Sequence, residues 1–254
     1  MSIQQIERNA LGHFEYLPLE GGYSVARNRD HTLIRCGLGS SMFNIAYGAL
    51  KGLNGEDLDA AITAVIKHFE GQPFAWWVPP SLKDESLTRA LVHQGFVVEA
   101  DEHAMLAMVA ELPSMQRKSD LRIERVQTLQ QLEDLIRVIE VYDTSVRPFY
   151  LGLPEDALLG DEQLFVGYTP EGEPICTAIL FVNEKSAGIF GVITDECQRG
   201  KGYGTDMMIF LLERAASLGL DTVTLSASSD SGYRIYERLG FKRLGQFECF
   251  EWGG

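Results

Sequence analysis

Residues 189–205 read IFGVITDECQRGKGYGT, and this stretch decides the fold class. Its first part, Ile189–Thr194, is rich in apolar and β-branched residues and is typical of a buried strand. Its second part places glycines at positions 200, 202 and 204, and a helical pattern follows from Tyr203 to Leu218. Glycine allows close approach of the backbone to a ligand, and a helix N-terminus offers unpaired N–H groups and partial positive charge. The stretch therefore predicts a strand, an anion-binding loop and a helix, in that order.

Three kinds of phosphate-binding motif can be compared with this loop. A P-loop needs Lys-Ser or Lys-Thr after its glycines, and neither follows here. A dinucleotide-binding GxGxxG motif needs its third glycine one place later than Gly204, and it belongs to the first strand of a βαβ unit. The pattern [RQ]-x-x-G-x-[GA] is met by Arg199, Gly202 and Gly204, and Lys201 adds a second positive charge.

A second motif, SSDSGYRIYERLGF, follows at residues 228–241. It combines a small polar start with a tyrosine, Tyr236, four residues before Gly240-Phe241. With the glycine loop before it, this order resembles the GNAT superfamily of N-acetyltransferases from Leu121 onward, about half of the chain. Ser229 stands where many members have Asn, and Glu196 stands where Pro is frequent.

The resemblance implies an acetyl-CoA-dependent N-acetyltransferase that moves an acyl group from acyl-CoA directly to an amine, without a metal. It makes Tyr236 the catalytic general acid that protonates the leaving thiolate, a role open to a phenol with a pKa near ~10 in a dry cleft. The residues it implies for binding acyl-CoA are Val192, Ile193, Thr194, Arg199, Gly200, Lys201, Gly202, Tyr203, Gly204, Thr205 and Ser229.

The general base and the acceptor are not identified by any motif. All five histidines lie in the first half, so a histidine-dependent site in the second half needs help from the first. Glu140, Asp143 and Asp195 are the candidate bases near element ends. The acceptor is a small-molecule or peptide amine. A non-catalytic acyl-CoA sensor that keeps the loop, and a nucleotide-dependent enzyme, remain as alternatives.

The composition of the 254 residues argues against other classes. A formal charge of −14, with neither half basic, argues against a nucleic-acid partner. The four cysteines show no metal-ligand spacing and fit reduced thiols in a cytosol. The apolar run Ile175–Val182 is of strand length and too short to span a bilayer. We expect a cytoplasmic monomer or homodimer without membrane contact.

The polar stretch 113–120 marks a domain boundary, which gives domains 1–115 and 120–254. The second domain is predicted to be α/β (α+β), with hairpin-linked strands before the glycine loop. Its predicted elements are the strands Leu121–Val126, Gln163–Tyr168, Pro174–Asn183, Ser186–Thr194 and Thr222–Ser226, the helices from a Thr128–Gln131 capping box, around Pro154–Gly160, over Tyr203–Leu218 and over Ser231–Leu239, and a hairpin-like ending over Phe241–Trp252.

The first half has a related order of elements. A helix over Glu56–Phe69, a strand over Phe74–Val78, a helix ending before Gly95-Phe96 and a strand over His103–Val109 are predicted. We therefore expect two GNAT-like domains, each a mixed, mostly antiparallel twisted sheet flanked by helices. The first is a degenerate copy, because it lacks the loop motif and has Leu91 where the second has Tyr236. Its Trp76 and Trp77 either line the acceptor pocket or belong to a core strand.

Overall fold

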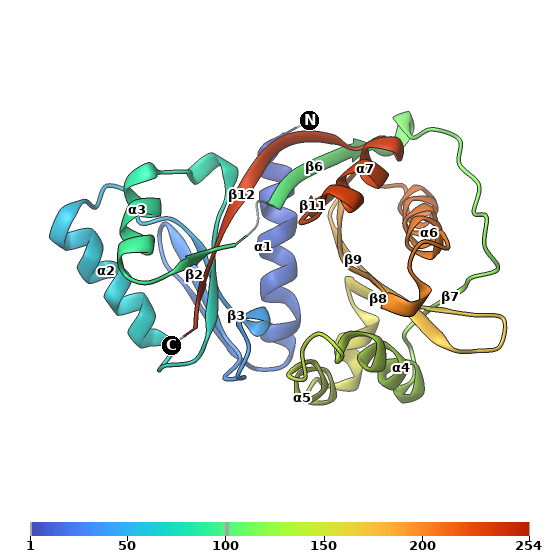
Figure 1. Cartoon of the computed structure of the whole chain (residues 1–254), viewed down its shortest axis with the longest axis horizontal. Helices are drawn as coiled ribbons and strands as arrows, with labels where there is room; N and C mark the ends of the chain where they lie inside the picture. Colours follow the sequence, from blue (N-terminus) through green and yellow to red (C-terminus); the bar gives the residue numbers. More distant parts are fainter. Residues whose placement is uncertain (1, 100–101, 254) are drawn as a thin grey trace.

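The computed structural model describes residues 2–99 and 102–253, which form helices packed on both faces of one large sheet (Figure 1). The helices are α1 (Ile3–Glu20), α2 (Gly55–His68), α3 (Glu85–His93), α4 (Leu129–Ile139), α5 (Val146–Leu151), α6 (Tyr203–Ser217) and α7 (Asp230–Arg238). The strands are β1 (Ser24–Arg27), β2 (His31–Arg35), β3 (Asn44–Gly48), β4 (Phe74–Val78), β5 (Val97–Val98), β6 (Glu102–Met108), β7 (Arg122–Arg125), β8 (Glu162–Tyr168), β9 (Pro174–Asn183), β10 (Ser186–Thr194), β11 (Thr222–Ala227) and β12 (Lys242–Trp252).

The sheet contains the same strand–helix–strand unit twice. Its strand order is β1-β2-β3-β4-β12-β6-β11-β10-β9-β8-β7, with β5 beside β12. Within the described residues, β3 with β4 and β10 with β11 pair in parallel, and the other pairs are antiparallel. Helix α2 joins the first parallel pair and α6 joins the second. The predicted α/β class is confirmed, and each half of the sheet is mixed and mostly antiparallel.

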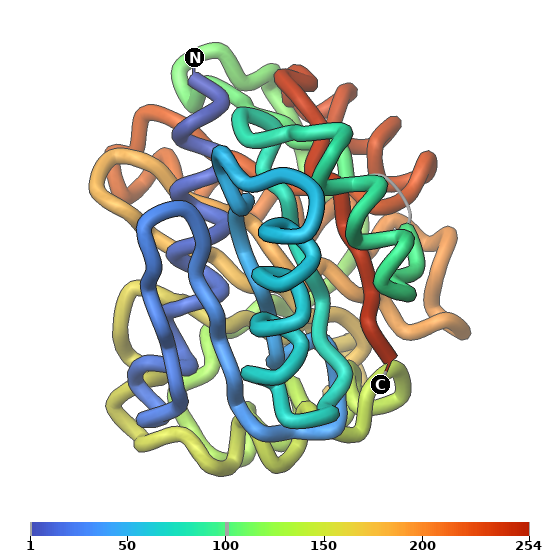
Figure 2. The backbone as a smooth tube through the Cα atoms, turned by 90° about the vertical axis from the view of Figure 1, so that its left-hand side faces the viewer, coloured from blue at the N-terminus to red at the C-terminus, as the bar shows by residue number. Residues whose placement is uncertain are grey.

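The last strand of each half pairs with the other half. Strand β6 lies between β11 and β12, with Leu106 opposite both Thr224 and Lys242. The later part of β12 pairs with β4, where Glu248 lies opposite Val78. Figure 2 shows β12, in red, running down beside the strands of the first half. The division into domains 1–115 and 120–254 stays a prediction, and each half of the sheet includes a strand from the other half of the chain.

The predicted hairpin-like ending over Phe241–Trp252 is wrong. The segment is one continuous strand, β12, with a bulge between Arg243 and Gly245. A Cβ on Gly245 would lie 2.9 Å from the Cβ of Pro80 and 3.0 Å from Cδ1 of Ile3. This glycine therefore permits close packing at a bulge and does not form a turn.

Helix α1 stands between the two halves and belongs to the core they share (Figure 1). Its Ile6, Ala10 and Leu17 pack in one apolar cluster with residues of α4, α5 and strands from both halves. A second cluster lies under α6, and a third lies under α2 and α3. The helices thus cover three apolar clusters, one shared by α1, α4 and α5, one under α6 and one under α2 and α3.

Buried polar contacts fix α1 to the second half. Asn9, only 1% exposed, donates from Nδ2 to Ser186 Oγ at 2.8 Å and Thr224 Oγ1 at 2.9 Å. Its Oδ1 accepts from Asn183 Nδ2 at 3.3 Å. Since buried polar groups cost free energy unless they are paired, these bonds specify where the helix sits.

The segment between α4 and β8 differs most from the sequence prediction. The Thr128–Gln131 capping box at the start of α4 is confirmed, although Leu129 is exposed. The helix predicted around Pro154–Gly160 is a short 3-10 helix over Glu155–Leu159, and α5 was not predicted.

Among the described residues, no helix is both long and apolar enough to cross a membrane.

Candidate functional site

The second half has an opening where two parallel strands diverge. Strand β10 pairs with β11 only from Ser186 to Ile189, although β10 continues to Thr194. Its pairing with β9 shifts register between Phe190 and Ile193. Within this bulge, Thr177 Oγ1 donates to the carbonyl of Gly191 at 3.2 Å. A bulge bends its strand, so the end of β10 leaves β11 and exposes an edge of backbone to a groove.

The glycine loop closes one end of this groove. Gly200 and Gly202 have φ angles of +79° and +90°, which residues with a Cβ rarely adopt. Gly202 is the N-cap of α6, so the first N–H groups of that helix point out of its start without helical partners. A Cβ on Gly204 would lie 3.3 Å from Thr194 Oγ1, so the loop packs closely on the end of β10.

The groove has a volume of about 810 Å³ and gathers the residues that the sequence nominated. Of the eleven nominated donor-binding residues, Lys201 alone is not in its lining, and its Nζ donates to Gln198 Oε1 at 2.7 Å. Tyr236 lies in the wall formed by α7. The nominated residues that line the groove are Val192, Ile193, Thr194, Arg199, Gly200, Gly202, Tyr203, Gly204, Thr205, Ser229 and Tyr236.

Arg199 is positioned by three neighbours. Its Nη2 donates to the hydroxyl of Tyr142 at 2.6 Å, and its Nε donates to the carbonyl of Thr194 at 3.3 Å. Its Nη1 lies 3.3 Å from Glu196 Oε1 in an exposed ion pair, which contributes little to stability. The guanidinium therefore lies over the groove and can exchange its partners for a phosphate.

Tyr236 is held in its protonated form by its surroundings. Burial, reinforced by the nearby Glu102 carboxylate, raises the pKa of the Tyr236 phenol to about 12. Ser229 caps α7 by accepting from the N–H of Gly232 at 3.2 Å, and the Tyr236 ring lies over that same glycine. Thus the phenol keeps its proton at neutral pH, in the wall of the groove.

The three predicted candidate bases lie in different surroundings. Glu140 is ion-paired with Arg147, which lowers the pKa of its carboxyl. Asp195 accepts from the N–H of Cys197 at 2.8 Å and caps a short 3-10 helix. Asp143 accepts from the Ser40 hydroxyl and from the Ser145 N–H, and it lines a second cavity.

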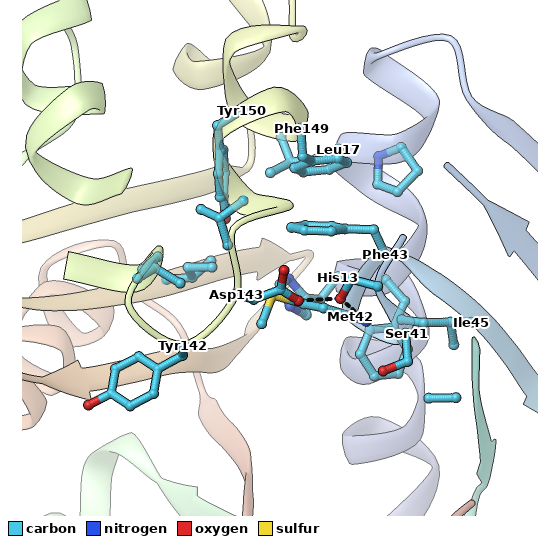
Figure 3. A pocket seen from close by; sticks show the side chains of 18 of the residues that line it. His13, Leu17, Ser41, Met42, Phe43, Ile45, Tyr142, Asp143, Phe149 and Tyr150 are labelled. Carbon is cyan, nitrogen blue, oxygen red and sulfur yellow. Dashed lines mark hydrogen bonds between the residues drawn. The ribbon is translucent and has the colours of Figure 1, made fainter. Parts of the chain in front are cut away.

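That second cavity, of about 460 Å³, lies between the two halves (Figure 3). Its walls come from α1, from the segment before β3, from β4, from the α4–α5 region and from the bulge of β10. Tyr142 and Ile193 line both this cavity and the groove, so the two spaces adjoin at the end of β10.

His13 and Glu162 meet in the wall of this cavity, although 149 residues separate them in the chain. The His13 Nδ1 lies 3.0 Å from Glu162 Oε2, and the imidazole stacks on Phe190 with ring centroids 3.9 Å apart. The Glu162 side chain is only 1% exposed. Sequence reasoning missed this pair because neither residue belongs to a motif, and only the packing of α1 against β8–β10 brings them together.

The two tryptophans of β4 have different roles. Trp76 is fully buried under α2 and α3, and its Nε1 donates to the carbonyl of Gly48 at 3.1 Å. Trp77 faces the other side of the sheet, lines the cavity and contacts Phe247 edge-on. Trp76 therefore belongs to a core strand, whereas Trp77 lines a cavity whose use by an acceptor stays a prediction.

Comparisons with known proteins identify the class of domain. Residues 129–241 match the model of the acetyltransferase (GNAT) family. The curated "Uncharacterized N-acetyltransferase CgeE" of Bacillus subtilis (strain 168) is 31% identical over 62% of this chain. That match spans 63% of the relative's length. The second half of the chain is therefore similar to the GNAT family, as its two motifs predict.

Solved structures extend the similarity in fold to the first half. A GCN5-related N-acetyltransferase from Kribbella flavida has a TM-score of 0.71 at 18% identity, over 98% of this chain and 95% of that one. A tandem GNAT protein from the clavulanic acid biosynthesis pathway has a TM-score of 0.55 at 11% identity, over 94% and 88%. The chain thus has a GNAT fold throughout, and a tandem arrangement agrees with the repeated strand–helix–strand unit.

Proposed function

We propose that this protein is an N-acetyltransferase that transfers an acetyl group from acetyl-CoA directly to an amine. The observation that supports this most is the joint position of three features around one groove. The diverging end of β10, the glycine loop at the start of α6 and the protonated phenol of Tyr236 all line it. A cytoplasmic location and a monomeric or homodimeric state remain predictions from the sequence.

In this proposal the loop holds the pyrophosphate of the donor. The N–H groups at the start of α6 would donate to its oxygens, and Arg199 would leave Tyr142 to pair with a phosphate. Lys201 lies at the edge of the groove on a flexible side chain and can follow. The backbone of Val192–Thr194, free of β11, would accept and donate hydrogen bonds along the pantetheine arm.

The chemistry requires little beyond positioning and one proton donor. A neutral amine attacks the thioester carbonyl, and backbone N–H groups of β10 would stabilise the oxyanion that forms. When the C–S bond breaks, Tyr236 gives its proton to the thiolate. A phenol with a pKa near 12 stays protonated at neutral pH, so it is ready in nearly every molecule.

Binding and turnover test this proposal separately. Calorimetric titration with acetyl-CoA should give saturable binding, and ATP or NAD should not compete. The variant Tyr236→Phe should lower kcat by about 10²–10⁴-fold with little change in acetyl-CoA affinity. Tyr233→Phe, one turn earlier on α7, is the matched control and should keep full turnover.

The main rival is a sensor that binds acyl-CoA without transferring the acyl group. It predicts binding of acetyl-CoA with no release of CoA thiol for any amine, and equal behaviour of the two tyrosine variants. Absence of acetyl-CoA binding at millimolar concentration would refute both functions.

A further inference from the structure

We propose that the cavity between the two halves is the acceptor site, that it takes a primary amine carried on a compact apolar body, and that His13, positioned by Glu162, removes the proton of the ammonium group. This inference rests on the proposed acetyltransferase function and adds its substrate class and its base. It also gives the first half a direct part in the reaction.

The walls of the cavity define the body of the acceptor. They are mainly aromatic and aliphatic, and include Phe14, Phe43, Trp77 and Phe149. Phe43 and Phe149 stack with ring centroids 4.1 Å apart (Figure 3). A hydroxylated or multiply charged body would lose hydrogen bonds to water here without replacing them, whereas an alkyl or arylalkyl body would not. The volume of 460 Å³ lies in the range of small-molecule sites.

The charges around the cavity define the head group. Asp143, Glu162 and Glu251 line it, and no lysine or arginine is among its described lining residues. An acidic cavity with apolar walls favours a single cation on an apolar body over an anion or a neutral sugar.

The cavity opens where the donor's thioester is expected. Gly191 and Ile193 of the β10 bulge line it, and Ile193 and Tyr142 also line the donor groove. An amine held in the cavity would therefore meet the acyl group at the end of β10, between the two spaces.

His13 is oriented so that one ring nitrogen can accept a proton. With Glu162 as a carboxylate, which only accepts hydrogen bonds, the hydrogen of neutral His13 lies on Nδ1 and the lone pair on Nε2. Stacking on Phe190 fixes the plane of the ring beside the bulge. The other ionisable groups that face the cavity are Tyr142, Asp143, Tyr150 and Glu251, and burial keeps Tyr150 neutral by raising the pKa of its phenol.

The proton and electron balance of the reaction is complete with these groups. The Nε2 of His13 takes one proton from the ammonium group, and the freed lone pair forms the N–C bond while the carbonyl pair moves to oxygen. Return of that pair breaks the C–S bond, and the thiolate takes the proton of Tyr236. The amide nitrogen loses its second hydrogen to restore the phenol through water, and His13 releases one proton to solvent.

A panel of amines tests the acceptor class on the full chain. Release of CoA thiol from acetyl-CoA should be at least about tenfold more efficient, in kcat/KM, with phenethylamine or hexylamine than with spermidine, glucosamine or a lysine peptide. Met42→Trp, at a half-exposed position in the cavity wall, should raise KM for phenethylamine and leave acetyl-CoA affinity unchanged.

The outcomes separate this inference from the proposed function. If acetyl-CoA binds but the polyamine, sugar or peptide is preferred, or if neither apolar amine reacts, the acceptor assignment is overturned and donor binding stands. If acetyl-CoA does not bind, the proposed function fails, and this inference fails with it.

The role of His13 is tested by the dependence of the rate on pH. His13→Gln should lower kcat about hundredfold at pH 7 and much less near pH 10, where a large part of the amine is already neutral. Glu162→Gln should give a smaller loss with the same recovery at high pH. His93→Gln, on the exposed face of α3, is the control and should have no effect. A loss for His13→Gln that is equal at both pH values would mean a structural role and would overturn the assignment of the base.

Discussion

The two strand–helix–strand units of this chain share an architecture and differ at the end of their first strand. In the unit β10–α6–β11, β10 continues five residues beyond its last partner on β11 and leads into the glycine loop. In the unit β3–α2–β4, β3 pairs with β4 through Tyr47 and ends one residue later, at Gly48. The unit β10–α6–β11 therefore has a groove at this position, whereas in the unit β3–α2–β4 the two strands stay paired.

In the first half, other residues occupy the positions that correspond to the groove. The indole of Trp76 donates to the carbonyl of Gly48 and ties the end of β3 to β4. Leu91, at the place of Tyr236, is fully buried on the inner face of α3. The first turn of α2 carries Glu56 and Asp57, which already offset the partial positive charge that α6 would offer to a phosphate. Where the second half has a groove, the first half thus has packed core residues.

The largest expected difference between the two units comes from a matched pair of glycine substitutions. Gly200, before α6, and Gly52, before α2, have the same φ of +79°, and neither has an atom within 4 Å of a built Cβ. Valine at either position adds similar backbone strain. We expect Gly200→Val to weaken acetyl-CoA binding about tenfold to hundredfold, because the loop must move away from its phosphate-binding shape.

Gly52→Val is the control for that measurement. It should change the calorimetric dissociation constant for acetyl-CoA by less than about twofold, although it adds strain of the same kind. Equal weakening by both substitutions would mean that the first half also binds the donor, and the contrast between the two units would then be wrong.

A smaller effect, on the free energy of unfolding, is expected where Trp76 joins β3 to β4 in the first half. Trp76→Phe leaves the Gly48 carbonyl without its buried donor and should lower the free energy of unfolding by about 1–3 kcal/mol. Denaturation in urea measures the change. Trp77→Phe is the comparison, since no hydrogen bond from its indole nitrogen is found in the described part of the chain, and it should cost less. If Trp76→Phe costs no more than Trp77→Phe, the indole does not hold β3 to β4.

Much of the second half could be predicted because its signals are local. The capping box at Thr128, the hairpin-linked strands and the glycine loop all depend on residues close together in the sequence. The residues predicted to bind the donor lie in or next to two short motifs, and the fold brings all of them except Lys201 to one groove with Tyr236. The hairpin-like ending was wrong because Gly245 serves packing against Pro80, a contact from the other half.

The second cavity could not be predicted, because its residues come from segments that are distant in the sequence. Helix α1 has no motif, and its position depends on the bonds of Asn9 to Ser186 and Thr224. The exchange of β6 and β12 between the halves leaves no signal in the local pattern of either strand. His13 and Glu162 are brought together by this packing and by nothing in their neighbouring sequence.

The smallest expected effect is on the pH dependence of kcat, which should hardly fall between pH 8 and pH 10. It depends on the burial of Tyr236, whose place in the first half is taken by Leu91. Burial raises the pKa of Tyr236 from about 10 to about 12, so the phenol loses its proton only as the pH rises through 12. Between pH 8 and pH 10, at saturating amine, kcat should therefore fall by less than about twofold. A general acid with an ordinary tyrosine pKa of ~10 would be half deprotonated at pH 10. A fall of kcat with a midpoint near pH 10, present in the wild type and absent in Tyr236→Phe, would mean that the second half does not shield its tyrosine from water.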